Sequence, residues 1–282
     1  MKKINFAFWG TPDIASNTLE LLKDNGYIPN IIITSVDTRA GRGMHLSQTP
    51  VSIWAEKNNI KCLKPEKITP LFINELSLFD IDISIVVAYG KILPEKIINL
   101  PKLGTINIHY SLLPKYRGAS PLESCLLNGD QTTGVSIQQM QYKLDSGPIL
   151  IDEEINIGIN TSKNELKVEL IKLGGKLLCN IFPRIIEKEI IPKIQNEKEA
   201  TYCTKIKKED GLIDLNKNNI ENYNKYRAFY GWPGVYFFAN QNGRKIRIKI
   251  NEATYEKNTF VIKKVTPEGR KLIDYSIFLK QN

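Results

Sequence analysis

Short apolar segments alternate with amphipathic helical patterns through the first two hundred residues, and this alternation limits the possible folds more than any other feature. The apolar segments are rich in β-branched residues and lie at 4–9, 28–34, 60–63, 81–88 and 105–109. Helical patterns separate them at 13–25, 51–59, 71–78 and 95–99. This βαβα order predicts an α/β domain with a mostly parallel sheet covered by helices on both faces.

Two polar side chains lie at the end of the last of these strands. Asn107 and His109 are two residues apart, so they project from the same face. Ligands in open α/β sheets bind at the carboxyl ends of strands, which favours an active site here. A later turn, after a strand-like segment at 133–139, offers Asp145. A histidine on a strand is more often a packed core residue, and periodicity alone does not bring Asp145 to His109.

The loop at residues 37–45 has an unusual composition. It contains two glycines together with Arg39 and Arg42, and it connects a strand to a helix. Glycine gives the backbone freedom and arginine binds phosphate, so we expect a mobile basic finger that reaches phosphate groups. It is not a P-loop, because no GK[ST] follows. A flexible solvent loop would have the same composition, and the sequence leaves both interpretations open.

The last third of the chain differs from the rest in pattern and charge. Short strands at 235–239, 245–250 and 260–265 surround an Asn242-Gly243 hairpin signal, which predicts a small β-domain resembling a barrel. Residues 1–200 carry 23 basic and 22 acidic side chains, whereas residues 201–282 carry 16 and 8. This imbalance suggests a polyanion partner, although a solvated lysine-rich face is the common alternative. Residues 226–230 and Trp232 are expected to form the hydrophobic seat of this domain.

Composition argues against several other classes of protein. No apolar run approaches the roughly 20 residues of a membrane span. The chain enters a strand almost at once, so no signal peptide is expected and the location expected is cytoplasmic. The four cysteines show no CxxC spacing, which indicates reduced thiols and argues against a zinc site.

Several motifs together resemble the signature of the formyltransferases that use 10-formyltetrahydrofolate. They lie at 107–109 (Asn-x-His), 111–121, 128–130, 133–135 and 144–148 (Leu-Asp-Ser-Gly-Pro). Further segments fall in the order found in the members that act on tRNA, at 10–13, 39–43, 63–67, 208–214, 227–229 and 232–234. The resemblance covers nearly the whole chain.

The resemblance implies a reaction and a set of site residues. The formyl group of 10-formyltetrahydrofolate, a co-substrate, would pass to the α-amine of methionyl initiator tRNA for translation initiation, without a metal and in a monomer. Asn107, His109 and Asp145 would be catalytic. The folate site would be formed by Ala88, Tyr89, Gly90, Ile92, Leu93, Ser111, Leu112, Leu113 and Pro114. The tRNA would be held by Arg39 and Arg42 of the finger and, on one face of a C-terminal strand, by Lys245, Arg247 and Lys249.

The resemblance also implies a domain plan, with one departure. A Rossmann-like catalytic domain would occupy residues 1–190, and a linker would follow at 191–206. Residues 207–282 would form a barrel of the OB type that binds tRNA. Between residues 253 and 260 a section of the family's barrel is absent, so we expect a smaller barrel, and the sequence does not decide whether it closes.

Two alternatives to tRNA formylation stay open. The first is formyl transfer to a small amine, such as a nucleotide-linked amino sugar, against which the basic finger and the basic C-terminal segment argue. The second is a non-catalytic RNA-binding protein, against which the Asn107, His109 and Asp145 set argues.

Overall fold

The computed structural model describes residues 4–40, 45–241 and 243–280, and the chain forms two compact units. The first unit contains residues 1–117, 134–154 and 168–202, and the second contains 118–133, 155–167 and 203–282. The chain therefore contributes two early segments to the second unit before its last eighty residues join it. The domain boundaries expected from the sequence stay a prediction.

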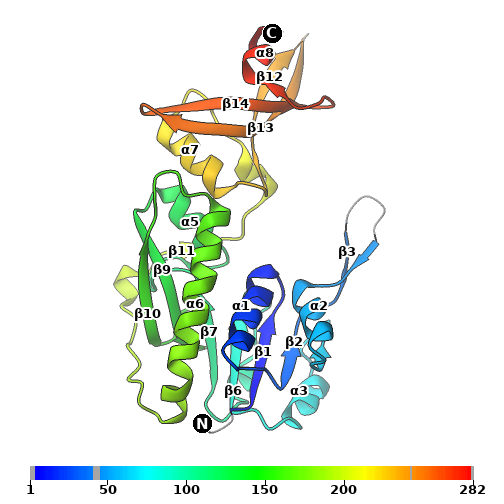
Figure 1. Ribbon diagram of the computed structural model, residues 1–282, viewed down its shortest axis with the longest axis vertical. Coiled ribbons are helices and arrows are strands. Elements are labelled where there is room, and N and C mark those ends of the chain that lie inside the picture. The colour runs from blue at the N-terminus through cyan, green and yellow to red at the C-terminus, as the bar shows by residue number, and fades with distance from the viewer. Residues whose placement is uncertain (1–3, 41–44, 242, 281–282) are drawn as a thin grey trace. The chain divides into compact units, whose positions relative to one another are not determined.

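A seven-stranded sheet forms the centre of the first unit (Figure 1). Its order is β10-β9-β7-β6-β1-β2-β5. The strands are β1 (Phe6–Gly10), β2 (Ile31–Ile33), β5 (Cys62–Leu63), β6 (Ile83–Val87), β7 (Thr105–His109), β9 (Thr132–Gln139) and β10 (Ile149–Asn156). The five strands from β7 to β5 in this order pair in parallel, and β9 runs antiparallel to β7. The expected mostly parallel sheet is confirmed.

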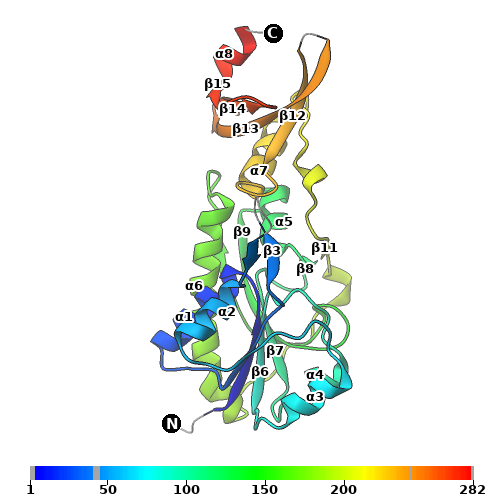
Figure 2. The ribbon, with the colours of Figure 1, turned by 90° about the vertical axis from the view of Figure 1, so that its right-hand side faces the viewer.

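Helices cover both faces of this sheet (Figures 1 and 2). Helices α1 (Asp13–Asp24) and α6 (Lys163–Ile186) lie on one face, where Phe6 of β1 contacts Phe182 of α6 with ring centroids 5.5 Å apart. Helices α3 (Pro70–Ser77) and α4 (Glu95–Ile98) lie on the other, around the fully buried Trp9. Helix α2 (Pro50–Lys57) packs against α1. In the described ranges no helix has both the length and the apolar content needed to cross a membrane.

The basic finger is a β-hairpin at its base. Strands β3 (Thr38–Ala40) and β4 (His45–Ser47) pair antiparallel, so the expectation of an unpaired loop over residues 37–45 is wrong. Three-residue strands are too short to show an alternating pattern, and this explains the error. An ion pair of 2.8 Å between Lys64 and Asp37 fixes the start of the hairpin. Arg42 lies outside the described residues, as does the side chain of Arg39.

The second unit contains a small antiparallel sheet of order β12-β13-β14-β15. Its strands are β12 (Val235–Gln241), β13 (Arg244–Glu256), β14 (Thr259–Pro267) and β15 (Ile273–Asp274). Its helices are α5 (Pro121–Asn128), α7 (Asn219–Ala228) and α8 (Tyr275–Lys280). The remaining elements of the chain, which do not all belong to this unit, are a two-stranded sheet of β8 (Arg117–Gly118) and β11 (Tyr202–Cys203) and 3-10 turns at Glu197–Glu199 and Lys208–Gly211. The expected small C-terminal β-domain is confirmed, as an open sheet whose ends are β12 and β15.

A tight turn lies between residues 253 and 260, where the resemblance implies that a section of barrel is absent. Lys257 and Asn258 join β13 directly to β14, and their φ angles are 48° and 61°. Two successive positive φ angles are what a type I′ hairpin turn requires, so the chain reverses in two residues.

The hydrophobic seat predicted at residues 226–230 and Trp232 is only partly as expected, because Phe229 is buried but Trp232 is 52% exposed.

Candidate active site

Pairing between β7 and β9 brings the predicted site residues together. In the antiparallel register Asn107 lies opposite Gln138 and His109 lies opposite Ser136. The chain leaves β9 one residue after Gln138 and turns back through residues 140–148, which carry Asp145. Asp145 thereby returns to the face of the sheet that presents Asn107 and His109.

The Asp145 carboxylate lies at the centre of this group. Its Oδ1 accepts hydrogen bonds from Gln138 Nε2 at 2.9 Å and from Asn107 Nδ2 at 3.5 Å. Its Oδ2 lies 3.7 Å from His109 Nδ1. Contacts between catalytic groups are often long before substrate binds, so a distance of this size is compatible with a working pair.

The imidazole of His109 is fixed through its other nitrogen. His109 Nε2 lies 2.9 Å from the main-chain oxygen of Tyr116, which can only accept a hydrogen bond. Nε2 therefore carries a hydrogen and donates it, and Nδ1 is the nitrogen that faces Asp145. His109 is 4% exposed, so the ring has little freedom to turn.

Asp145 has a backbone conformation that is unusual for a residue with a side chain. Its φ is 47°, in the left-handed region, which costs on the order of 1 kcal/mol or more outside glycine. Gln195 Nε2 donates to the main-chain oxygens of Asp145 at 2.9 Å and of Gly147 at 2.7 Å. These two hydrogen bonds hold the turn in the conformation that directs the carboxylate at His109.

Sequence reasoning did not single out Gln138 or Gln195. Gln138 is recognisable only from the β7–β9 register, which a single sequence does not give. Gln195 lies in the segment expected to cross the surface as a linker, yet it is buried. No local signal in the sequence distinguishes it, because the neighbouring Asn196 is also an uncharged polar residue.

The predicted folate-site residues after β7 form a tightly bonded turn. The buried Ser111 donates through Oγ to the main-chain oxygen of Lys115 at 2.6 Å. Ser136 of β9 donates to the Ser111 main-chain oxygen at 2.8 Å and accepts from the Leu113 N–H at 2.9 Å. Leu113 is buried, and Leu112 and Pro114 are half-buried. Ser136 thus anchors this turn to the strand beside the candidate catalytic group.

The other predicted folate-site residues follow β6, the parallel neighbour of β7. Ala88 and Gly90 are exposed and have φ angles of 47° and 80°, so the chain turns sharply with its main chain accessible. Ile92 is 81% exposed, whereas Tyr89 and Leu93 are buried in the core. Burial raises the pKa of Tyr89 to about 12. A ligand beside this turn can meet Tyr89 and Leu93 only through their main chain.

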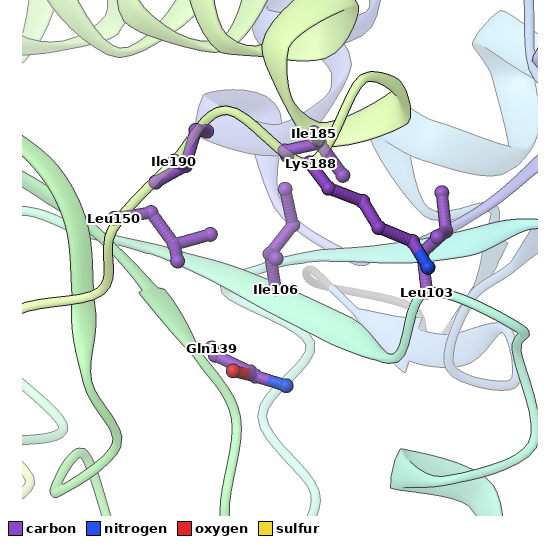
Figure 3. A pocket seen from close by; sticks show the side chains of 7 residues that line it. All are labelled: Leu103, Ile106, Gln139, Leu150, Ile185, Lys188 and Ile190. Carbon is purple, nitrogen blue, oxygen red and sulfur yellow. The ribbon is translucent and has the colours of Figure 1, made fainter.

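A cavity of about 180 Å³ lies on the opposite face of β7 (Figure 3). Its lining residues come from β7, β9, β10, the end of α6 and the segments beside them: Leu103, Ile106, Gln139, Leu150, Ile185, Lys188 and Ile190. Ile106 adjoins Asn107 and therefore points to the other side of the sheet. The cavity contains none of the predicted site residues.

The predicted basic face of β13 is exposed. Lys245, Arg247 and Lys249 are exposed to solvent. The residues that alternate with them face inward: Ile246, Ile248 and Ile250. The Arg247 guanidinium carbon lies 3.8 Å from the centre of the Tyr236 ring, and Lys245 Nζ lies 4.7 Å from that of Phe238. The face therefore combines positive charge with aromatic rings.

The described residues offer little for metal binding. Across 4–40, 45–241 and 243–280, no group of three or more His, Cys, Asp or Glu is placed to hold a metal ion. All four cysteines are free thiols. Burial raises the pKa of Cys62 and of Cys125 to about 11, so both thiols stay protonated near neutral pH.

Gly147→Ala is expected to lower turnover about 10-fold or more, because an added Cβ would lie 1.7 Å from the main-chain oxygen of Gln139 and displace the Asp145 turn. The midpoint of thermal unfolding should also fall. Gly158→Ala is the matched control, since its Cβ would meet only the Thr161 hydroxyl at 3.0 Å. Steady-state kinetics and thermal unfolding of both variants make the test, and equal turnover in the two would contradict it.

Comparison with known proteins places the chain in a family. A family model described as formyl transferase matches residues 2–182, and one described as formyl transferase, C-terminal domain, matches residues 205–261. A methionyl-tRNA formyltransferase of Sulfurihydrogenibium sp. is 40% identical over 248 residues, covering 87% of this chain and 80% of that protein. One from Geobacter sulfurreducens is 33% identical over 298 residues, covering 99% and 94%.

Solved structures agree in fold. The N-formyltransferase of Helicobacter canadensis, in complex with folinic acid and dTDP-3-aminofucose, is similar to this chain with a TM-score of 0.64. It is 22% identical and covers 96% of this chain and 98% of its own, a likeness that shows the fold alone. Because the first family model spans more than half of the sequence and relatives above 30% identity extend over most of it, the chain belongs to the formyl transferase family.

Proposed function

We propose that this protein transfers the formyl group of 10-formyltetrahydrofolate to the α-amine of methionyl initiator tRNA, giving N-formylmethionyl-tRNA. Relatives that are 33% to 40% identical over most of the chain are named methionyl-tRNA formyltransferase. The observation that carries the proposal is the convergence of Asn107 and His109 on the carboxylate of Asp145. An amide donor, an imidazole and a carboxylate at one point suit acyl transfer to an amine.

The main demand of this reaction is stabilisation of negative charge. An α-amine has an unperturbed pKa of about 7.7–8.0, so a substantial fraction is already neutral near neutral pH. Attack on the formyl carbon converts its oxygen into an oxyanion. The Asn107 amide carries two N–H groups, and its 3.5 Å contact with Asp145 occupies at most one of them. Donation of the other to the oxyanion is worth about 3 kcal/mol of barrier.

Asp145 and His109 would handle the protons. The attacking amine must lose a proton and the departing folate nitrogen must gain one when the carbon–nitrogen bond breaks. Asp145 would accept the first, directly or through water, and would keep the His109 ring in place. His109 Nδ1 faces the same space, and as an imidazolium the ring would carry a hydrogen on Nδ1 as well as on Nε2, which it would donate to the oxyanion or to the leaving nitrogen.

The folate would lie beside the turn that follows β6. Exposed main-chain groups at Ala88 and Gly90 can pair with the edge of a flat heterocycle, and the exposed Ile92 offers apolar contact. The anchored turn from Ser111 to Pro114 would bound the site next to His109. The buried side chains of Tyr89 and Leu93 would shape it from behind.

The tRNA would be bound by basic groups in both units. Arg39 and Arg42 of the finger would contact the end of the acceptor stem, and the exposed face with Lys245, Arg247 and Lys249 would contact the backbone. In this plan residues 1–190 form the catalytic domain, 191–206 the linker and 207–282 the shortened tRNA-binding domain. The pairs of β13 cations with β12 rings support it, because arginine and aromatic side chains recur where proteins bind nucleic acid strands.

A direct assay tests the proposal. The protein is incubated with 10-formyltetrahydrofolate and charged initiator tRNA, and the product is analysed for formylmethionine. A parallel reaction offers a nucleotide-linked amino sugar, the type of acceptor present with the Helicobacter canadensis enzyme. Formylated sugar without formylmethionine would replace the tRNA proposal by the small-amine alternative.

Arg42→Ala is expected to weaken transfer to tRNA while leaving slow hydrolysis of the formyl-folate unchanged, because the finger would contact only the acceptor. Rates of both reactions are measured on the same preparation. Equal loss of the two activities would mean that the finger supports the fold or the folate site.

A further inference from the structure

Arg117 is a buried charge that the proposed chemistry does not use. It follows the turn at residues 111–116 and is fully buried. Its Nη1 has no hydrogen-bond partner in the described part of the chain. A guanidinium withdrawn from water destabilises a protein unless its donors are well directed, so apolar packing would be the more stable choice for structure alone. The direction of its other donors therefore indicates what it does.

Two donor nitrogens of Arg117 converge on one amide. Nε and Nη2 donate to Gln195 Oε1 at 3.0 and 2.8 Å. A guanidinium only donates, so the oxygen of the Gln195 amide must face Arg117 and its nitrogen must face away. Arg117 thus decides which way this buried amide is turned.

The nitrogen of that amide is directed at the Asp145 turn. Its two shortest contacts, to the main-chain oxygens of Asp145 and Gly147, use its two hydrogens. A longer contact of 3.4 Å reaches Gln138 Oε1, and Gln138 in turn donates to Asp145 Oδ1. Gln195 therefore holds the main chain of Asp145, and Gln138, which contacts Gln195, holds its carboxylate.

Ion pairs of Glu197 connect Arg117 to the exposed side of the same turn. Glu197 Oε1 lies 2.8 Å from Arg117 Nη2, and its Oε2 lies 2.7 Å from Nζ of Lys143, which belongs to the Asp145 turn. Hydrogen bonds from Arg117 and Lys143 lower the pKa of Glu197 to about 2, so it is ionised at any working pH. Residues 195 and 197 thus clamp the turn on its inner and outer sides.

We propose that Arg117 and Gln195 are positioning residues for formyl transfer, which set the Asp145 turn so that the carboxylate faces His109. The inference rests on the proposed function of Asp145. It assigns a catalytic purpose to part of the segment that the sequence indicated to be a linker.

Gln195→Glu tests the proposal with little change of shape. A carboxylate keeps the acceptor for Arg117 but cannot donate to the main-chain oxygens of Asp145 and Gly147, and it repels the Asp145 side chain. Turnover is expected to fall about 10-fold or more, with KM for both substrates unchanged, because positioning and not binding is lost. Asn196→Asp is the matched control, since it makes the same chemical change at an exposed neighbour, and it should behave as wild type.

A double variant separates positioning from general stability. In an Asp145→Asn background the carboxylate is already gone, so adding Gln195→Glu should reduce turnover little further. A role in stability alone would give the full loss again, together with a lower unfolding midpoint in both backgrounds. Additive losses would overturn the proposal.

Magnetic resonance of isotope-labelled histidine gives a readout that needs no substrate. The chain has two histidines, and His45→Gln assigns their signals. Gln195→Glu should shift the His109 ring resonances and Asn196→Asp should not. Unshifted His109 signals would overturn the positioning role, whatever the enzyme formylates. Shifted signals in a protein that does not formylate tRNA would instead refute the proposed function and leave the positioning of Asp145 standing.

Discussion

Alanine in place of Asn107, His109 or Asp145 is expected to lower turnover by at least about 10²-fold in each case. In the proposed mechanism, Asn107→Ala removes the donor to the oxyanion, and Asp145→Ala removes the proton acceptor that also orients His109. Asn107 and His109 each place a nitrogen within 3.7 Å of an Asp145 oxygen, so each loss should also impair the other two groups. Combined variants should therefore cost much less than the product of the single losses.

Single-turnover kinetics on methionyl-tRNA measure these losses, and thermal unfolding checks that each variant is folded. Asp152→Ala is a suitable control, because it removes an exposed carboxylate from β10 of the same sheet. Near-normal turnover in His109→Ala would show that the imidazole does no chemistry and that the mechanism is wrong.

Replacing Lys245, Arg247 and Lys249 together by alanine is expected to flatten the salt dependence of tRNA binding. Each lysine or arginine that neutralises a phosphate makes the negative slope of log affinity against log salt steeper by about 0.9 on duplex. Three lost contacts would make that slope less steep by about 2.7. Between 50 and 200 mM salt the wild type should then lose roughly 40-fold more affinity than the variant. Fluorescence titrations at a series of salt concentrations measure both slopes.

The control for this titration removes the same charge elsewhere. Lys57, Lys96 and Lys172 are exposed in the first unit, and their triple alanine variant should keep the wild-type slope. Binding of formyl-folate should be equal in all three proteins. Identical slopes for wild type and the β13 variant would exclude this strand from the tRNA site.

Local periodicity was enough to predict several parts of the site. Alternation along a strand places Asn107 and His109 on one face, and the same rule placed Lys245, Arg247 and Lys249 on the exposed face of β13. The βαβα order likewise predicted the mostly parallel sheet. The β3–β4 hairpin was missed because its strands are three residues long and show no period.

What surrounds Asp145 could not be predicted from local pattern. Asn107 and Asp145 are 38 residues apart in the chain, and Arg117 and Gln195 are 78 residues apart. Their contacts depend on the register between β7 and β9 and on the return of the chain after α6. Hydrophobic patterning records only whether a residue faces the core, so it cannot show which amide will face which carbonyl.

The sequence by itself therefore determined the fold class, the family resemblance and the identity of the three catalytic candidates. Only the tertiary structure decided that Asp145 adopts a left-handed backbone, that His109 presents Nδ1 to it, and that buried Gln195 holds its turn. The physical reason is the range of the interactions. Side-chain alternation follows from the geometry of neighbouring residues, whereas hydrogen-bond direction in a buried network is set by groups that meet only when the chain has folded.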